Sequence, residues 1–415
     1  MEEKSMNKQP LKRKWSMKKI ILVIVSLCSF LVLSFSVHLS HQQGFVSLFP
    51  FVSSTMVYVN KNGELAHGMQ KIGKDYYYFS KETGFMKKGF QTIGHKTYYF
   101  DKNGKRVTGL RKINEKTYYF EKDGQMLKKE FKAYTKDEKP MLSYFDQKGH
   151  MVTGTKTINK KKYVFDKNGN LQIDIEEIQN DVQEILSQYS GDISVYFKDL
   201  RTRKEFEIHP QSMYPCCMIK TVALAAVFQE IDAGTINYAQ YEQWIEPMIT
   251  ISDNTSYNVL MEVIGDGNGL YGLHKANVLA QQIGMRNTAL HHGLQPGQHF
   301  FTDGGANVSC ASDIGIFFEK LYDHELGSKK SCDQMIDLFK RCTDYTALQS
   351  GLGQNVEFAH KSGCADTYYH DGGIVYLPGR DYILVVFSKD VNVYASLMYE
   401  ISSCVFQYQD TLCDF

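Results

Sequence analysis

The chain has 415 residues, of which 43% are hydrophobic and 22% charged, and this composition excludes a disordered protein. Its length predicts two or three domains. The net charge of +1 hides an uneven distribution. Residues 61–172 carry 25 lysines and arginines against 12 acidic residues, whereas residues 173–415 carry 15 against 32. A basic middle and an acidic C-terminal half predict separate modules with separate partners.

The N-terminus is basic, and residues 20–37 that follow contain no charge. Eighteen such residues are the low end of a membrane-spanning helix, and the positive residues before it predict a cytoplasmic N-terminus. We therefore predict a cytoplasmic segment at 1–19, a single-pass signal-anchor helix in the cell membrane at 20–38, and extracytoplasmic domains after it. The alternative is a cleaved signal peptide and a secreted protein, since Ser34 and Ser36 offer small residues for cleavage.

Nine cysteines are present, and all except Cys28 lie in the C-terminal half. An exported location permits disulfides, but eight cysteines allow 105 full pairings, and their spacing does not select one. The sequence contains no CxxC pair and no His/Cys cluster with zinc-site spacing. We predict no metal site and no cofactor.

Residues 56–172 repeat with a step of 20 to 25 residues. The turn glycines keep this step, as does an aromatic triplet such as Tyr98-Tyr99-Phe100; these glycines are Gly63, Gly84, Gly104, Gly124, Gly149 and Gly169. Asn-Gly and Asp-Gly pairs, such as Asn103-Gly104, predict turns that each join two short strands. One hairpin is marginal by itself, so we predict a solenoid in which stacking buries the aromatic rings.

This pattern resembles the cell-wall-binding repeats of Gram-positive surface proteins, including the choline-binding and glucan-binding types. The resemblance implies that the partner is a wall polymer: peptidoglycan, teichoic acid or glucan. The choline type uses tryptophan, whereas here Met69, Phe90 and Leu110 stand at the corresponding positions. Tyrosine faces would hold choline more weakly. Most of the aromatics would then form the stacking core, and exposed tyrosines and lysines would contact anionic wall polymers.

A second pattern begins at residue 175. A helical periodicity is followed by strand patterns at 193–197 and 206–208, and then by Cys217-Met218-Ile219-Lys220 ahead of a buried helix predicted at 221–233. This spacing matches the S-x-x-K motif, with cysteine in place of serine. At a helix start it puts thiol and amine on one face, beside backbone N–H groups that can bind an oxyanion.

Two further motifs follow in order: Ser252-Asp253-Asn254, and Lys361-Ser362-Gly363 at the start of a strand. Three motifs in this order are specific. Residues 175–412 resemble the class A β-lactamase and penicillin-binding superfamily. The resemblance implies an α/β (α+β) domain with an antiparallel sheet and a helical lobe. The predicted fold is thus multidomain: a transmembrane helix, a β-hairpin solenoid and this domain.

The resemblance implies a role for each motif residue. Cys217 attacks a carbonyl, Lys220 takes its proton, and Ser252 passes a proton to the leaving nitrogen. Asn254 holds the site together and contacts the substrate, and backbone N–H groups of residues 217 and 364 form the oxyanion hole. The predicted catalytic set is therefore Cys217, Lys220, Ser252, Asn254 and Lys361, and the predicted substrate-binding set is Ser362, Gly363 and Cys364.

Three departures bear on activity. The nucleophile is a cysteine, and a site shaped for a hydroxyl group must accommodate a larger sulfur. The family's β-lactamases carry a glutamate that activates the deacylating water, but residues 287–313 contain none; Pro296 stands at its place and Gln298 near the usual asparagine. Only 35 residues separate Cys217 from Ser252, which predicts a trimmed helical lobe. By analogy with some relatives, a Cys216–Cys364 disulfide is one interpretation and two buried thiols are the other.

These observations leave three functions open. The leading one is a wall-associated acyl-transferring hydrolase that acts on β-lactams or D-alanyl peptides. The second is a catalytically impaired protein that recognises peptidoglycan without turnover, and the third is a cysteine acyltransferase that works through a thioester. The membrane would be contacted through residues 20–38, and we expect no nucleic-acid partner.

Overall fold

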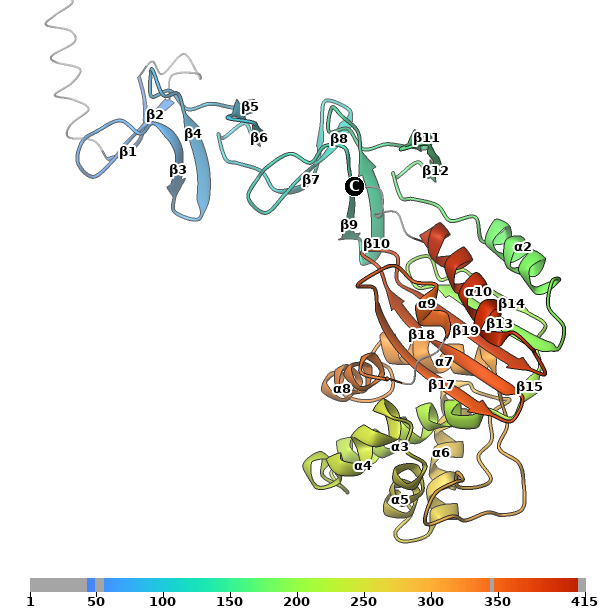
Figure 1. Ribbon diagram of the computed structural model, residues 1–415. Helices are drawn as coiled ribbons and strands as arrows, with labels where there is room; N and C mark the ends of the chain where they lie inside the picture. The colour runs from blue at the N-terminus through green and yellow to red at the C-terminus, as the bar shows by residue number, and fades with distance from the viewer. Residues whose placement is uncertain (1–42, 49–55, 344–346, 410–415) are drawn as a thin grey trace, which may run out of the picture. The chain divides into compact units, whose positions relative to one another are not determined.

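The computed structural model describes residues 43–48, 56–343 and 347–409 (Figure 1). The predicted cytoplasmic segment 1–19 and signal-anchor 20–38 lie outside the described residues. Within the described ranges, no helix has the length and hydrophobicity needed to cross a bilayer. The chain forms two compact units, one made of residues up to 130 with 145–151, and one made of 131–144 with residues from 152 onward.

The repeats fold as paired strands, as predicted. The pairs are β1 (Gly44–Ser47) with β2 (Met56–Val59), β3 (Gly68–Ile72) with β4 (Asp75–Phe79), β5 (Gly89–Ile93) with β6 (Lys96–Phe100), β7 (Gly109–Ile113) with β8 (Lys116–Phe120), β9 (Glu130–Lys136) with β10 (Lys139–Phe145), and β11 (Gly154–Ile158) with β12 (Lys161–Phe165). Pairing at Gly44–Ser47 extends the strand pattern to the N-terminal side of residue 56.

The turn within each hairpin differs from the prediction. β7 and β8 are joined through Asn114 and Glu115, both with positive φ (47° and 65°), and not through an Asn-Gly pair. The Asn103-Gly104 turn follows β6, and the residue beyond it, Arg106, pairs back with Phe100 as an isolated bridge. Asn-Gly favours any tight turn with positive φ. The sequence alone therefore could not decide which of two turns joins the longer strands.

Stacking of successive repeats buries the predicted aromatic core. Phe79, Phe100 and Phe120 are fully buried. Backbone hydrogen bonds link neighbouring repeats, for example from the Met86 N–H to the Met56 carbonyl at 2.7 Å. Turn glycines lie against the repeat before them, because a Cβ on Gly104 would come within 2.4 Å of the Met86 sulfur. Each repeat thus contributes one layer of a solenoid.

The C-terminal domain is built on a five-stranded antiparallel sheet in the order β14-β13-β19-β18-β17. Its strands are β13 (Asp192–Asp199), β14 (Glu205–Ile208), β17 (Glu357–Ala365), β18 (Tyr368–Tyr376) and β19 (Tyr382–Lys389). A separate short pair joins β15 (Ser212–Met213) to β16 (Ser309–Cys310). The strands predicted at 193–197 and 206–208 both belong to the main sheet, and the prediction of an antiparallel sheet is confirmed.

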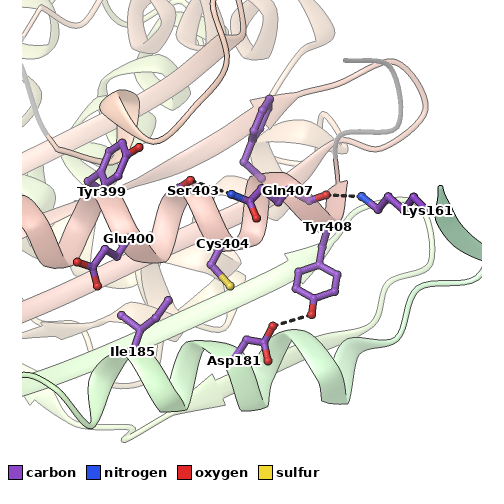
Figure 2. A pocket seen from close by; sticks show the side chains of 10 residues that line it. Lys161, Asp181, Ile185, Tyr399, Glu400, Ser403, Cys404, Gln407 and Tyr408 are labelled. Atoms are coloured by element: carbon purple, nitrogen blue, oxygen red, sulfur yellow. Dashed lines mark hydrogen bonds between the residues drawn. The ribbon is translucent and has the colours of Figure 1, made fainter. Parts of the chain in front are cut away.

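One face of the sheet is covered by α2 (Ile175–Leu186), α10 (Tyr394–Gln409) and the short α9 (Ala347–Ser350), and α2 and α10 lie side by side (Figure 1). Between α2, α10 and Lys161 lies a pocket of about 760 Å³ (Figure 2). Its polar contacts include Tyr408 Oη to Asp181 Oδ2 at 2.6 Å and Lys161 Nζ to the Gln407 carbonyl at 2.5 Å. These helices pack with an apolar core separate from the one that Cys217 contacts.

The other face carries the helical lobe. It contains the 3₁₀ helix η1 (Cys216–Ile219), α3 (Lys220–Asp232), α4 (Tyr238–Thr250), α5 (Asn254–Ile264), α6 (Gly269–Ile283), α7 (Ala311–Tyr322) and α8 (Lys329–Lys340). The first nine residues of α3 are all buried, which fits its apolar sequence on every side. The helix predicted at 221–233 is thus present, and its first turn is held in the centre of the lobe.

The last repeat residues pack with this domain. Asn170 Oδ1 accepts hydrogen bonds from Arg201 Nη1 at 2.8 Å and from the Leu142 backbone N–H at 3.0 Å. Ala133 lies so close to Gly379 that a Cβ there would be 2.6 Å from the alanine Cβ. Residues 131–144 and 152–172 are therefore part of the C-terminal unit's packing, although their sequence continues the repeat pattern.

Candidate active site

Cys217 and Lys220 stand three residues apart in the 3₁₀ helix and first α-helical position. Side chains at i and i+3 eclipse one another in a 3₁₀ helix, so thiol and amine project from the same face. The Lys220 Nζ lies 3.4 Å from the Cys217 Sγ. The structure thus brings together the two residues that the S-x-x-K spacing singled out.

Lys220 is completely buried, and its ammonium group has several hydrogen-bond acceptors. Its Nζ donates to the Ser252 carbonyl at 2.5 Å, to Asn254 Oδ1 at 2.7 Å and to Ser252 Oγ at 3.3 Å, in addition to the thiol contact. The pKa of Lys220 is lowered to about 8, chiefly by burial and also by the charge of Lys361, against the opposing effect of Cys217. An amine with a pKa near neutrality can both take and return a proton.

The Cys217 thiol is half-buried and lies near the positively charged side chains of Lys220 and Lys361. Burial by itself raises a thiol pKa, but the charges of Lys220 and Lys361 and the hydrogen bonds from Ser252 and Lys220 outweigh it. The net effect holds the pKa of Cys217 below its ordinary value of 9.0. This arrangement favours the thiolate, which is the form of a cysteine that acts as a nucleophile.

Ser252 and Asn254 are positioned by the start of α5. Asp253 caps the helix, because its Oδ1 accepts the Ser256 backbone N–H at 2.6 Å. Ser252 precedes the cap with a φ of +60°, a conformation that sets its carbonyl and hydroxyl beside Lys220. The predicted proton relay and the predicted structural amide therefore both contact the lysine.

Strand β17 passes directly beside Cys217. Lys361 and Ser362 are buried, and the Lys361 Nζ donates to the Ser362 carbonyl at 3.0 Å. Gly363 is required by close approach, since a Cβ there would lie 2.9 Å from the Cys217 backbone nitrogen. The third motif is thus brought against the first, and the strand lies next to the Cys217 N–H predicted for the oxyanion hole.

The Cys216–Cys364 disulfide, one of the two interpretations of these cysteines, is not formed. Cys216 carries a free, buried thiol whose pKa is strongly raised by burial. Gly363 is the strand residue whose side-chain direction meets Cys216, because a Cβ on this glycine would lie 3.0 Å from the Cys216 Cβ. Successive strand residues point to opposite faces, so Cys364 turns away and is exposed. The other interpretation, two buried thiols, is right for Cys216 and wrong for Cys364, which is exposed.

His370 is a positioning residue that the motifs did not reveal. Its ring stacks on Phe387 at 4.1 Å, and burial lowers its pKa to about 4, so the ring is neutral. Its Nδ1 accepts the Ser388 backbone N–H at 3.2 Å, which leaves the proton on Nε2 to be donated to the Tyr214 carbonyl at 2.9 Å. His370 thereby fixes the backbone three residues before Cys217. The only sequence signal was a histidine within a strand pattern.

Asn258, also missed as a site residue, holds the segment that follows α6. Its Nδ2 donates to the carbonyls of Leu294 and Gln298 at 3.0 and 2.7 Å, and its Oδ1 accepts the Leu294 N–H at 2.7 Å. Gly297 lies beside Asn254, where a Cβ would be 3.1 Å from the asparagine Cβ. Residues 287–302 contain no carboxylate. The segment that runs past the site therefore brings no general base of that kind.

The repeats carry aromatic triads that sequence reasoning also missed. Phe90 contacts Tyr99 and Tyr118 with ring centroids 4.8 and 5.1 Å apart. Two similar groups exist: Phe45 with Tyr58 and Tyr77, and Phe131 with Tyr144 and Tyr163. Phe45 and Phe90 are 43% and 40% exposed. Exposed aromatic faces of this kind can bind a cationic group. Among the described residues, no cluster of histidine, cysteine or carboxylate side chains could hold a metal ion.

Comparison with solved structures supports this assignment of the fold. A structure of PBP-A is 23% identical and covers 58% of this chain and 100% of its own, with a TM-score of 0.51. An acyl-enzyme complex of a PBP-A variant with penicillin G is 23% identical and covers 57% and 98%, with a TM-score of 0.50. A β-lactamase from Sphaerobacter thermophilus is 17% identical and covers 58% and 99%, also at 0.50. A search of curated proteins gave no match.

Two family models match the sequence. The choline-binding repeat matches residues 87–131 and 107–149. The model described as "Beta-lactamase enzyme family" matches residues 177–241 and 238–409, which together are more than half of the chain. The chain therefore belongs to the beta-lactamase enzyme family and carries choline-binding repeats ahead of the family domain.

Proposed function

We propose that this protein is a wall-associated, penicillin-recognising acyl-transfer enzyme in which Cys217 forms a thioester with a β-lactam or a D-alanyl peptide. The observation that carries the proposal is the position of the Lys220 Nζ. It contacts the Cys217 Sγ, the Ser252 Oγ and the Asn254 Oδ1 at once. A buried lysine held this way can move a proton between the nucleophile and the relay.

The acylation step balances with these groups. Lys220 takes the thiol proton, and the Cys217 thiolate attacks the substrate carbonyl. Backbone N–H groups of residues 217 and 364 receive the oxyanion. As the carbonyl re-forms, the C–N bond breaks, and the departing nitrogen takes the proton from Lys220 through the Ser252 hydroxyl. The products are a thioester on Cys217 and a neutral amine. Lys361 and Ser362 would hold the substrate carboxylate.

Release of the acyl group is the step for which the site is poorly equipped. A positioned general base typically contributes ~10²–10⁴-fold, and residues 287–302 supply no carboxylate. The thioester should therefore persist in water, while an amine acceptor could displace it. This favours penicillin-binding or transpeptidase-like behaviour over antibiotic hydrolysis. The acyl-enzyme described for a PBP-A variant, a protein of the same fold, is consistent with a long-lived acyl state.

We base the proposed location on the other parts of the chain. Residues 20–38 would anchor the protein in the cell membrane, or be removed as a signal peptide, with the rest outside. The choline-binding repeats would hold wall polymers, with the exposed ring of Phe90, which packs on Tyr99 and Tyr118, facing cationic groups. The excess of lysine and arginine in residues 61–172 would attract anionic polymers, so wall binding should weaken as salt increases.

Intact mass after incubation with penicillin G tests the proposal. The wild type should gain one penicillin and keep it, whereas Cys217→Ala should gain none. Cys404→Ala, which removes a thiol of α10 on the other face of the sheet, should behave as the wild type. Nitrocefin should give one turnover per protein. Many rapid turnovers would show that another group replaces the glutamate, and absence of any adduct would favour recognition of peptidoglycan without chemistry.

A further inference from the structure

The repeats contain one position where the stacking pattern is broken. The residue that bridges back after each turn is apolar in five repeats, at Leu65, Met86, Met126, Met151 and Leu171, but it is Arg106 in the repeat between those of Met86 and Met126. Natural sequences tend to break a local rule at functional sites. A charged residue at a stacking position therefore requires a reason beyond the fold.

The aliphatic part of the Arg106 side chain occupies the stacking position, and its charged guanidinium lies next to that position. Its Cδ lies where a Cβ on Gly124 would be only 2.4 Å away, so the stem replaces the methionine of other layers. Its guanidinium lies 4.1 Å from the Tyr76 ring, and its Nη2 donates weakly to the Lys122 carbonyl at 3.3 Å. The Nε is buried and has no hydrogen-bond partner within the described part of the chain.

A pocket of about 520 Å³ opens at this residue. Its charged lining consists of Lys105, Arg106, Arg111, Lys112, Asp75 and Asp101, and we name it the Arg106 pocket. Both carboxylates are already engaged. Asp75 pairs with Lys105 at 2.6 Å, and Asp101 accepts the backbone N–H groups of its own turn at 2.8 and 2.9 Å.

The two arginines of the pocket form no direct ion pair within the described residues, although Arg106 interacts electrostatically with Asp123, which itself pairs with Lys96 at 3.2 Å. Neither Arg106 nor Arg111 forms an ion pair with a carboxylate of the described residues; the Nη1 of Arg111 donates only to the Leu110 carbonyl at 2.8 Å. Lys112 pairs with Glu115 at 2.9 Å, but both are exposed at the surface, where such a pair is worth little. An arginine fork beside other cations is suited to a phosphate group.

We propose that the Arg106 pocket is a binding subsite for the phosphate group of an anionic polyol-phosphate polymer. The polymer identity rests on the proposed wall association; the phosphate chemistry rests on the pocket alone. Arg106 would supply a rigid, ring-stacked fork, and Arg111 and Lys112 would contribute further positive charge at its exposed side. The subsite is distinct from cation binding on the aromatic triads, because it selects the opposite charge.

The test uses the full chain and isothermal titration at low salt with a synthetic poly(glycerol phosphate) oligomer. Arg106→Met restores the residue type found at Met86 and Met126, so the solenoid should fold as before. Its affinity for the oligomer should fall about tenfold, which is the loss expected for a charge-assisted hydrogen bond. Lys81→Met removes the same charge from an exposed position outside the pocket and should change affinity less than about twofold.

Several outcomes separate this subsite from the wider proposal. If the wild type binds Gram-positive walls but Arg106→Met binds the oligomer equally well, the subsite is wrong and wall association stands. If the wild type binds no wall material, the wall proposal fails, while tight binding of the oligomer or of inorganic phosphate would still support the pocket. Phosphate that competes as well as the oligomer identifies a free ion as the ligand. Should Arg106→Met unfold, Arg111→Gln at an exposed position must show the same loss, or the proposal fails.

Discussion

The chemistry of the site depends on how Cys217 is ionised. Lys220 and Lys361 lower the thiol pKa, whereas burial raises the pKa of the thiols Cys216, Cys310, Cys332 and Cys404, the last to about 11. A reagent that attacks thiolates should therefore distinguish Cys217 from the buried thiols at neutral pH, even though it is itself only half-exposed.

We expect iodoacetamide to alkylate Cys217 of the folded protein before the buried thiols. The rate should rise with pH to a midpoint below 9.0, because only the thiolate reacts. In Lys220→Gln the midpoint should move upward, and the rate at pH 7 should fall at least about tenfold, as one pKa unit of lost stabilisation requires. Peptide mass spectrometry over a pH series measures both. Protection of Cys217 while buried thiols react would contradict its role as nucleophile.

His370 links the site to the stability of the fold. Its pKa in the folded protein is about 4, below the ordinary 6.5, so the unfolded chain binds the extra proton more readily. Its contribution to stability is therefore complete above pH 6.5 and is lost as the pH falls toward 4. The melting temperature of the wild type should fall as the pH is lowered across this range, and that of His370→Gln should fall less. Identical pH profiles would show that the ring does not titrate as inferred.

At the scale of elements, the site forms where the start of a helix packs against a strand. Gly363 lets β17 approach the Cys217 backbone, and a methyl group there would be 2.9 Å from the nitrogen. Such a contact can be relieved only by moving the strand or the helix start. The separation of these two elements is thus set by one missing side chain.

Gly363→Ala should fold but acylate slowly. A misplacement of about 1 Å costs catalysis about 100-fold, so acylation by penicillin G should slow by about that factor. Ala365→Ser, two residues along the same strand, should retain the wild-type rate. Mass-detected acylation, with circular dichroism to verify folding, measures both. An unchanged rate in Gly363→Ala would mean that the close approach is not needed.

At the scale of the whole chain, the boundary between repeats and domain does not coincide with the end of the repeat pattern. The Asn170 side chain accepts a hydrogen bond from Nη1 of the Arg201 guanidinium. The other two nitrogens of this group, Nε and Nη2, have no hydrogen-bond partner among the described residues. A cut after residue 172 would remove the one hydrogen bond that this guanidinium makes within the described residues, a loss that is unfavourable.

A chain that begins at residue 131 should accordingly be more stable than one that begins at residue 173. The lost hydrogen bond to a buried charge is worth roughly 1.5–3 kcal/mol, which corresponds to about 5 °C in Tm for a domain of this size. Differential scanning fluorimetry of the two chains tests the expectation. In the longer chain, Asn170→Ala should account for part of the difference. Equal melting temperatures would show that the last repeat residues contribute nothing to the domain.

The sequence by itself determined the parts whose signals are local. The glycine period and the aromatic triplets predicted stacked strands, because the residues that determine the geometry of each repeat lie within that repeat. The spacing of Cys217 and Lys220 predicted their contact, since three residues along a helix start fix the distance between side chains. The order of three motifs was sufficient to indicate the family domain.

Only the tertiary structure decided the features that depend on distant segments. In the folded repeats the longer strands pair across one turn, and the other turn is followed only by an isolated bridge. The face on which Gly363 meets Cys216 excluded the considered disulfide, because strand direction is set by β17's neighbours in the sheet. The roles of His370 and Arg106 appear only because the main sheet brings His370 to Tyr214 and the stacked repeats bring Arg106 to Tyr76, residues far from them in sequence. Local patterns specify elements, whereas burial and charge at a site arise from the packing of elements against one another.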